Sequence, residues 1–174
     1  VRRELMAQAA KMERTGLPLT HVDSHQHMHM LPGVIDISLD VAASLHLDAV
    51  RISRTPLFTA FAGMGQLIGR LGLFTLSELS LWKAKRRHFR VPDHFEGIVA
   101  GEAVHEGHFL HILKDLRPGT TEIMMHPGTD NEKLILACDW EHDFEAEMQA
   151  IVSPKVRRMI ADKAVKVVNY RDLK

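Results

Sequence analysis

The stretch from Leu19 to Gly33, LTHVDSHQHMHMLPG, joins an expected strand to an expected helix through a run of histidines. Residues 19–23 have the pattern of a short strand, and the closing Pro-Gly pair opens a helix over 34–46. Outside this stretch, an amphipathic helix is predicted over 2–15 and a second strand over 49–52. The order helix, strand, helix, strand predicts an α/β fold with a parallel sheet.

The C-terminal half of the chain continues this alternation of helices and strands. Its expected elements are helices over 103–116 and 141–151, a helix that begins at Ser153-Pro154, and strands over 121–125 and 165–168. The chain has 174 residues, of which 45% are hydrophobic, and this is enough for one sizeable core. Because no internal repeat is visible, we predict a single domain over residues 1–174.

The segment 55–90 departs from this rhythm and is predicted to be a helical insertion. Its long apolar stretch ends in a cationic run, which contains Lys83, Lys85, Arg86, Arg87, His88 and Arg90. Two interpretations of this run stay open. The favoured one is a helix packed over the main fold with a solvated basic end. The other is peripheral contact with an anionic membrane surface.

Composition excludes several classes of protein. Lys+Arg and Asp+Glu number 22 each, and this balance argues against a nucleic-acid binder. The single Cys138 excludes an internal disulfide and a cysteine-cluster metal site, and it fits a cytoplasmic setting. No apolar run has the length needed to span a bilayer. The chain begins without Met inside a helical pattern, so we expect that an upstream part is missing.

The segment from Thr20 to His29 is the first candidate for chemistry, because it holds four His and one Asp in ten residues. At strand spacing these side chains fall on one side of the chain, near the strand end where α/β folds collect their chemistry. Imidazole and carboxylate bind divalent metals, but a catalytic site needs about three protein ligands. This segment would supply one or two of them. The alternative is a solvated loop, or histidines that are hydrogen-bonded in the core.

A second candidate is His126, which ends the expected strand 121–125 and precedes a Pro-Gly turn. A general acid or a metal ligand would sit at such a position, although a histidine in a plain turn is the alternative. Arg51 and Arg54 follow an earlier strand in the same way and could orient a carboxylate or a substrate oxygen. For Arg54 a surface salt bridge is the favoured interpretation. His94 follows the insertion and could reach a substrate pocket from a loop.

Five strings of residues together resemble the YdjC-like carbohydrate deacetylases. In chain order they are THVDSHQHMHMLPG at 20–33, RISR at 51–54, GIVAGE at 97–102, PGTTEIMMHPG at 118–128 and VVNYRDL at 167–173. This family includes chitooligosaccharide deacetylases and members associated with hopanoid biosynthesis. The insertion and the residues 93–98 are most similar to the hopanoid-associated branch.

The resemblance implies a partial, distorted (β/α) TIM-like barrel of the polysaccharide deacetylase type. It implies a hydrolase in which a divalent metal, Mg or Zn, activates water to remove an N-acetyl group from a carbohydrate or a glycolipid sugar. By the same resemblance, His25 is a metal ligand and His126 lies in the active site. Asp23 is predicted to take part in catalysis with His126, while His27 and Arg51 match other pocket positions.

One departure from the family pattern limits what this chain can do alone. The family opens with a strand that ends in Asp-Asp-Phe-Gly and adds a further His ligand, and this sequence contains neither. A complete barrel needs about 250 residues, so we expect that the N-terminal part of the deacetylase domain is missing. The alternative function is therefore an incomplete, inactive fragment or a metal-binding module. A homodimer stays open.

Overall fold

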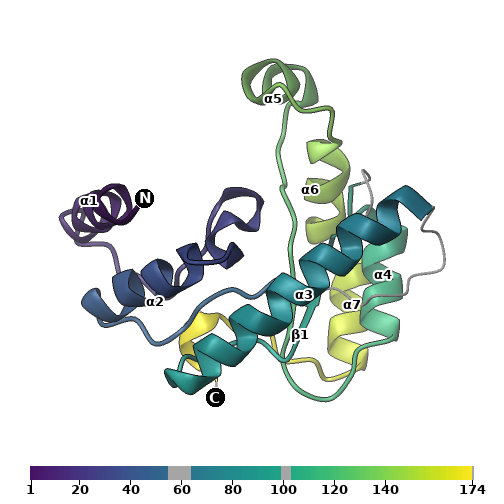
Figure 1. The fold of residues 1–174 in the computed structure, drawn as a ribbon. Coiled ribbons are helices and arrows are strands. Elements are labelled where there is room, and N and C mark those ends of the chain that lie inside the picture. The colour runs from purple at the N-terminus through teal and green to yellow at the C-terminus, as the bar shows by residue number, and fades with distance from the viewer. Residues whose placement is uncertain (55–63, 99–102, 174) are drawn as a thin grey trace. The chain divides into compact units, whose positions relative to one another are not determined.

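The computed structural model describes residues 1–54, 64–98 and 103–173, with the backbone alone for residues 64–70. The chain divides into two compact units, Val1–Asp93 with Val168–Lys174, and His94–Val167. Figure 1 shows the elements of both. The single domain predicted over 1–174 stays a prediction.

The first unit is built mainly of helices. They are α1 (Arg2–Glu13), α2 (Val34–Ser44) and α3 (Met64–Arg86), with the 3-10 helices η1 (His25–Met30) and η2 (Tyr170–Asp172). The helices expected over 2–15 and 34–46 are confirmed. The segment 55–90 is helical where α3 lies, whereas its residues 55–63 lie outside the described part of the chain; that this segment is an insertion stays a prediction.

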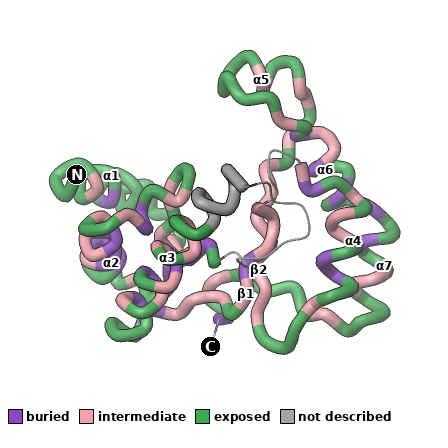
Figure 2. Tube along the Cα trace, turned by 45° about the vertical axis from the view of Figure 1, so that its right-hand side comes forward, coloured by how far each residue is buried: buried purple, intermediate pink, exposed green. Residues whose placement is uncertain are grey.

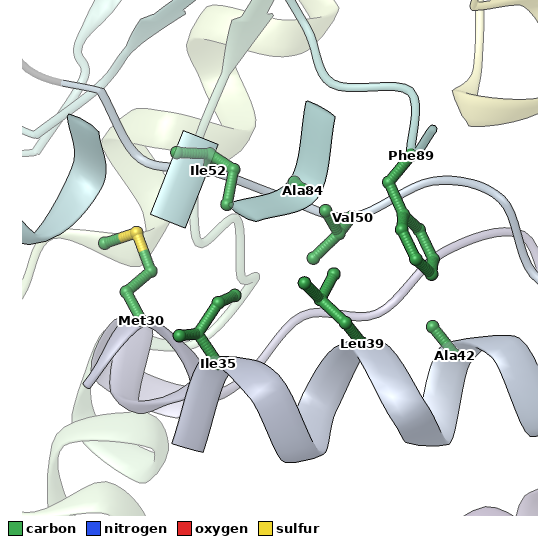
Figure 3. Close-up of a cluster of buried hydrophobic side chains, with 8 residues drawn as sticks. All are labelled: Met30, Ile35, Leu39, Ala42, Val50, Ile52, Ala84 and Phe89. Carbon is green, nitrogen blue, oxygen red and sulfur yellow. The ribbon is translucent and has the colours of Figure 1, made fainter. Parts of the chain in front are cut away.

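The core of the first unit lies between α2 and the segment that follows it. Ile35, Leu39 and Ala42 recur at helical spacing on α2 and are fully buried. In Figure 3 they face Val50 and Ile52, with Ala84 of α3 and Phe89 closing the cluster. One apolar stripe of α2 therefore fixes the position of the chain segment around residue 50.

Parallel pairing in the first unit is limited to isolated bridges. Val22 pairs with Val50, and Ala49 pairs with Arg90. The Val22 N–H donates to the Ala49 carbonyl at 3.2 Å, and the Arg51 N–H donates to the Val22 carbonyl at 3.0 Å. The strands expected over 19–23 and 49–52 thus meet in parallel, as predicted, but the regular pairing does not extend along them.

The second unit pairs a small parallel sheet with helices. Strand β1 (His94–Glu96) pairs with β2 (Thr121–Ile123) in the register His94 to Thr121. The helices are α4 (Glu106–Lys114), α5 (Asn131–Cys138), α6 (Phe144–Val152) and α7 (Pro154–Asp162). Helix α4 packs on α6 and α7, and Figure 2 shows buried positions on all three. The predicted α/β class is confirmed, whereas the barrel stays a prediction.

The ends of these helices follow from local chemistry. Ser153 begins α7, and its hydroxyl accepts from the backbone N–H of Lys155 at 3.1 Å, with Pro154 in the first turn. Asp143 begins α6 and accepts from the Ala146 N–H at 3.0 Å. The helices expected over 103–116 and 141–151 and the helix start at Ser153 are therefore confirmed, with small shifts at the ends.

Three elements differ from the sequence-based expectation. Strand β1 and helix α5 were not predicted, because β1 is three residues long and α5 has no buried residue to give it an apolar stripe. The strand predicted over 165–168 is wrong, because these residues are irregular. Gly97, just after β1, has a φ of 100°, and a Cβ there would collide with the backbone of Met124.

Candidate functional site

The histidine segment of the first unit does not continue as a strand. From His25 the chain forms η1, and Gln26 and His27 have φ values of 50° and 57°. This left-handed turn breaks the two-residue alternation that would put all the histidines on one side. The expectation that these side chains share one face is therefore wrong, because each ring meets a different environment.

His29 is held inside the first unit, with 2% of its surface exposed. Its Nε2 donates to the carbonyl of Arg51 at 2.7 Å, and its Nδ1 accepts from the Ser24 hydroxyl at 2.8 Å. The same hydroxyl accepts from the backbone N–H of His29 at 2.8 Å. Because both ring nitrogens are engaged, His29 joins the loop to the neighbouring segment and would lose these bonds on binding a metal.

Two predicted pocket residues, Asp23 and Arg51, are brought into contact. Their side chains form an ion pair, and Asp23 also accepts from the backbone N–H of Ser24 at 2.7 Å. Arg51 therefore orients a carboxylate, as the sequence suggested. Arg54 instead pairs with Glu78 on the surface, which was the favoured interpretation for this residue.

Of the remaining histidines of this segment, His21 and His27 contact neighbouring residues, whereas His25 is exposed to solvent. Nδ1 of His27 lies 2.7 Å from the hydroxyl of Ser53, a fully buried residue. The ring of His21 stacks on Tyr170 with centroids 3.6 Å apart. His25 is exposed, and within the described ranges its ring forms no hydrogen bond and joins no group of three donors close enough to share an ion. His25 therefore offers one accessible imidazole.

The second unit contains the set of donors that does converge. His126 follows β2, His142 lies just before α6, and Glu147 lies within α6. One donor atom from each lies within 4.8 Å of the other two. In the part of the chain that the structure describes, this is the one group of three His, Cys, Asp or Glu donors able to hold a metal ion.

Glu147 is the fixed point of this group, with 1% of its surface exposed. Its Oε1 accepts from the backbone N–H of Val104 at 2.9 Å, and its Oε2 accepts from the backbone N–H of His126. Oε1 also lies 3.1 Å from Nε2 of His142. The carboxylate thus holds the backbone of the segment that follows β2 and fixes the position of His126.

Aromatic rings surround the two histidines. Trp140 stacks on His142 with centroids 4.2 Å apart and meets His126 edge-on at 5.0 Å. Phe144 contacts His142 edge-on at 4.9 Å. The surroundings of Gly128 leave no room for a larger residue, because a Cβ at this position would collide with Leu134 and Phe144. The Pro-Gly turn after His126 is therefore packed against this aromatic group.

Each unit has a cavity beside its histidines. In the second unit an open pocket of about 640 Å³ has a mixed lining, in which Ala103, Ile135 and Ala146 lie beside the polar residues His105, Asn131, Glu141, His142 and Asp143. The Asn131 side chain donates to Asp143 at 2.9 Å, and this bond holds the pKa of the Asp143 carboxyl below its ordinary value. The cavity of the first unit, about 460 Å³, is mostly apolar and reaches the segment with His21, Asp23, Ser24 and His29.

His94 lies at the beginning of β1, and its Nε2 donates to the carbonyl of Pro118 at 3.0 Å. Its register partner is Thr121, the first residue of β2, whereas His126 lies beyond the other end of β2. His94 and His126 therefore stand at opposite ends of the strand pair. The place of His94 in a substrate pocket stays a prediction.

Comparison with known proteins gives the family. A model of the family described as YdjC-like protein matches residues 1–162. The chain belongs to the YdjC-like family. No solved structure matches it.

Relatives of this YdjC-like chain bear a common name, carbohydrate deacetylase. One from Thermoanaerobacter pseudethanolicus is 28% identical over 174 residues, which cover 100% of this chain and 60% of the relative. One from Brevibacillus brevis is 24% identical, with 99% of this chain and 61% of the relative covered. One from Mus musculus is 28% identical, with 99% and 62% covered. The chain therefore spans about three-fifths of the length of these relatives.

Sequence reasoning found His126 but missed its two neighbours. His142 stands alone in its segment, and no local pattern marks it. Glu147 carries a signal in retrospect, because it occupies the buried stripe of α6 between Phe144 and Ala150. A glutamate at an apolar position of a helix indicates a buried carboxylate with specific partners.

Proposed function

We propose that this chain is the larger part of a metal-dependent hydrolase that removes an N-acetyl group from a carbohydrate or a glycolipid sugar. The observation that carries the proposal is the family match over residues 1–162, together with relatives named carbohydrate deacetylase over this whole chain. The reaction is hydrolysis of a C–N bond other than a peptide bond. It needs an activated water, a means of stabilising the oxyanion and an acid for the departing amine.

The metal of this reaction is proposed to be Mg²⁺ or Zn²⁺, with His25 as one ligand. His25 is exposed and offers a ring that no described residue engages, which suits a ligand. A catalytic metal needs about three protein ligands, so further ligands would come from the part of the family sequence that this chain does not span. When bound, such an ion lowers the pKa of a water ligand and polarises the acetyl carbonyl.

Asp23, Arg51 and His27 are proposed to line the pocket around His25. The ion pair with Arg51 fixes the Asp23 carboxylate, and Ser53 holds His27 through its Nδ1. A fixed carboxylate can orient a water or a sugar hydroxyl by accepting its hydrogen bond. Asp23 would thus assist catalysis, while Arg51 acts as its positioning residue.

His126 is proposed as the general acid that protonates the departing amine. Its backbone is anchored by Glu147 at the end of β2, and its ring is bordered by Trp140 and His142. Parallel α/β folds place their reacting groups beyond the carboxyl ends of the strands, which is where His126 lies. An imidazole suits this role because its pKa is near neutrality.

The finer parts of the proposal concern architecture and substrate. The parallel bridges that join the segments at Val22, Val50 and Arg90 support a barrel-like arrangement of strands. The hopanoid-associated branch, with a lipid-linked sugar as substrate, rests on the sequence resemblance alone. On α3, Lys83 pairs with Asp36 at 2.6 Å, and Arg87, just beyond it, pairs with Asp40 at 2.8 Å. This favours a packed helix over a membrane-binding one, and no described helix is both long and apolar enough to cross a bilayer.

Acetate release tests the proposal. The substrates are N-acetylglucosamine oligosaccharides and an N-acetylated glycolipid, and the protein is this chain completed with the unmatched part of the Thermoanaerobacter pseudethanolicus relative. We expect acetate with added Mg²⁺ or Zn²⁺, and we expect His25→Ala to lower both bound metal and rate. His111→Ala, at an exposed histidine of α4, is the matched control. Stoichiometric metal binding without acetate release would favour the metal-binding module instead.

A further inference from the structure

We propose that His126, His142 and Glu147 form a second divalent-metal site of the zinc type. It lies entirely within the second unit and shares no residue with the proposed site at His25. The inference concerns metal binding alone, but it uses His126, which is also the proposed general acid. Four features of the structure carry it.

The first feature is a buried carboxylate that is held in place. Two backbone N–H groups, those of Val104 and His126, fix the two oxygens of Glu147. Each carboxylate oxygen has a second lone pair, so these bonds leave acceptor positions for an ion. Among the described residues the one ion-pair partner of Glu147 is His142, and no Lys or Arg neutralises it. A buried carboxylate requires a positive partner to offset the cost of its desolvation.

The second feature is the ring of His142. The side chain is 5% exposed, and its Nε2 lies 3.1 Å from Oε1 of Glu147. Despite this distance, Nε2 makes no hydrogen bond of acceptable geometry with any described residue. Nε2 of His142 and Oε1 of Glu147 are both electron-rich and both buried, so they repel each other unless a cation lies between or beside them. That cation is a proton or a metal ion.

The third feature favours a metal ion over a proton, because a proton needs only one acceptor beside His142. The ring of His126 stands perpendicular to that of His142, at 85°, with centroids 5.5 Å apart. It brings a third donor atom within 4.8 Å of the other two. Metal bonds of about 2.0–2.1 Å in a tetrahedral site put neighbouring donors roughly 3.4 Å apart. The rings would have to turn to bring the three donors to this spacing around one ion.

The chemistry of the donors indicates which ion. Two imidazoles and one carboxylate are a set that binds Zn²⁺ and leaves a fourth position for water, whereas Mg²⁺ prefers oxygen donors. Trp140 and Phe144 surround His142 with apolar rings, as outer shells of metal sites often do. His142 also lines the cavity of about 640 Å³, which gives an ion a path from solvent.

Occupation of this site has a consequence for His126. A ring nitrogen bonded to a metal cannot deliver a proton, so the ion and the general-acid role exclude each other at any one time. The two proposals can therefore fail separately. A failure to detect acetate release would not contradict the metal site proposed here. A failure to bind zinc at this site would not contradict the deacetylase proposal.

The test is a Co²⁺ titration of the 174-residue chain, followed by visible absorption, with Zn²⁺ displacement measured by calorimetry. We expect an absorption band typical of tetrahedral Co²⁺, and an affinity that falls at least about tenfold in His142→Ala. His126→Ala is the second variant, because the backbone N–H that holds Glu147 survives this change. His111→Ala is expected to keep the band. Circular dichroism of each variant checks that it is folded. A His142→Ala or His126→Ala protein that binds Co²⁺ with unchanged affinity and spectrum would overturn the proposal.

Discussion

Two regions of the molecule hold metal-binding types of side chain, but only one of them brings three such side chains together. They are the histidine segment at Thr20–His29 and the group His126, His142 and Glu147. The first is dense in sequence, but its rings are taken by local partners: His29 by Ser24 and the Arg51 carbonyl, and His27 by Ser53. The second is spread over 22 residues and still brings three donors within 4.8 Å. Proximity of ligand-type residues in sequence therefore says little about a site until the backbone conformation is known.

The largest expected effect is on the rate, at His126. His126→Asn removes the proposed acid but keeps the backbone N–H that bonds to Glu147. We expect kcat for acetate release to fall about 10²–10⁴-fold, with a small change in KM. His111→Asn is the control for a histidine on the same unit. A variant with the wild-type rate would show that the second group has no part in the reaction.

The next largest effect is on stability, at Glu147. Glu147→Ala leaves the N–H groups of Val104 and His126 without their acceptor in a buried place. We expect the free energy of unfolding in urea to fall by about 3–5 kcal/mol. Glu132→Ala, at an exposed position of α5, is expected to change it by less than about 0.5 kcal/mol. Equal effects at both positions would contradict the anchoring role of Glu147.

A third comparison separates two histidines of the first segment. His29→Ala removes a buried ring with both nitrogens bonded, so we expect a loss of about 2–4 kcal/mol in the free energy of unfolding. His25→Ala removes an exposed ring, and we expect a change below about 0.5 kcal/mol. Chemical denaturation of the two variants side by side measures the difference. Similar losses would mean that His25 is also a structural residue.

The smallest expected effect concerns Glu96, a half-buried carboxylate at the end of β1. Burial raises its pKa, while the charges of Arg117, His94 and His111 act in the opposite direction. The folded state therefore holds its proton more tightly than the unfolded state. The free energy of unfolding should fall as pH rises from the ordinary carboxyl range through the raised pKa, and it should stay lower above it.

Glu96→Gln removes this titration. We expect the variant to be more stable than the wild type at neutral pH by less than about 1 kcal/mol, because the carboxylate is partly solvated and Arg117 lies 3.9 Å away. At acidic pH the two proteins should converge. Urea unfolding measured across that range checks this, with Glu132→Gln as the control. A stability gap that widens as pH falls would reverse the sign and contradict the assignment.

The helices could be predicted from the sequence because their signals are local. Ser153 and Pro154 start α7, and the stripe of Ile35, Leu39 and Ala42 identifies the buried face of α2. The turn at Gln26 and His27 could not be predicted, because non-glycine residues adopt a positive φ only in a small minority of cases, even though His does so more often than most. Tertiary contacts set that conformation, with the Ser24 hydroxyl and the Arg51 carbonyl holding His29.

The candidate site was predictable in part for a similar reason. His126 follows a strand and precedes a Pro-Gly turn, so a local pattern marks it. His142 and Glu147 reach it only because α6 packs beside the segment that follows β2, and the Gly128 N–H donates to the Phe144 carbonyl at 2.9 Å. No pattern in the sequence encodes that contact.

The most direct test of the account is the metal dependence of acetate release from an N-acetylglucosamine oligosaccharide. The protein is this chain completed with the unmatched part of a YdjC-like relative, and the rate is measured before and after removal of metal by EDTA. We expect that release falls to background with EDTA and returns when Mg²⁺ or Zn²⁺ is restored. An unchanged rate in EDTA, or no acetate with any metal, would contradict it.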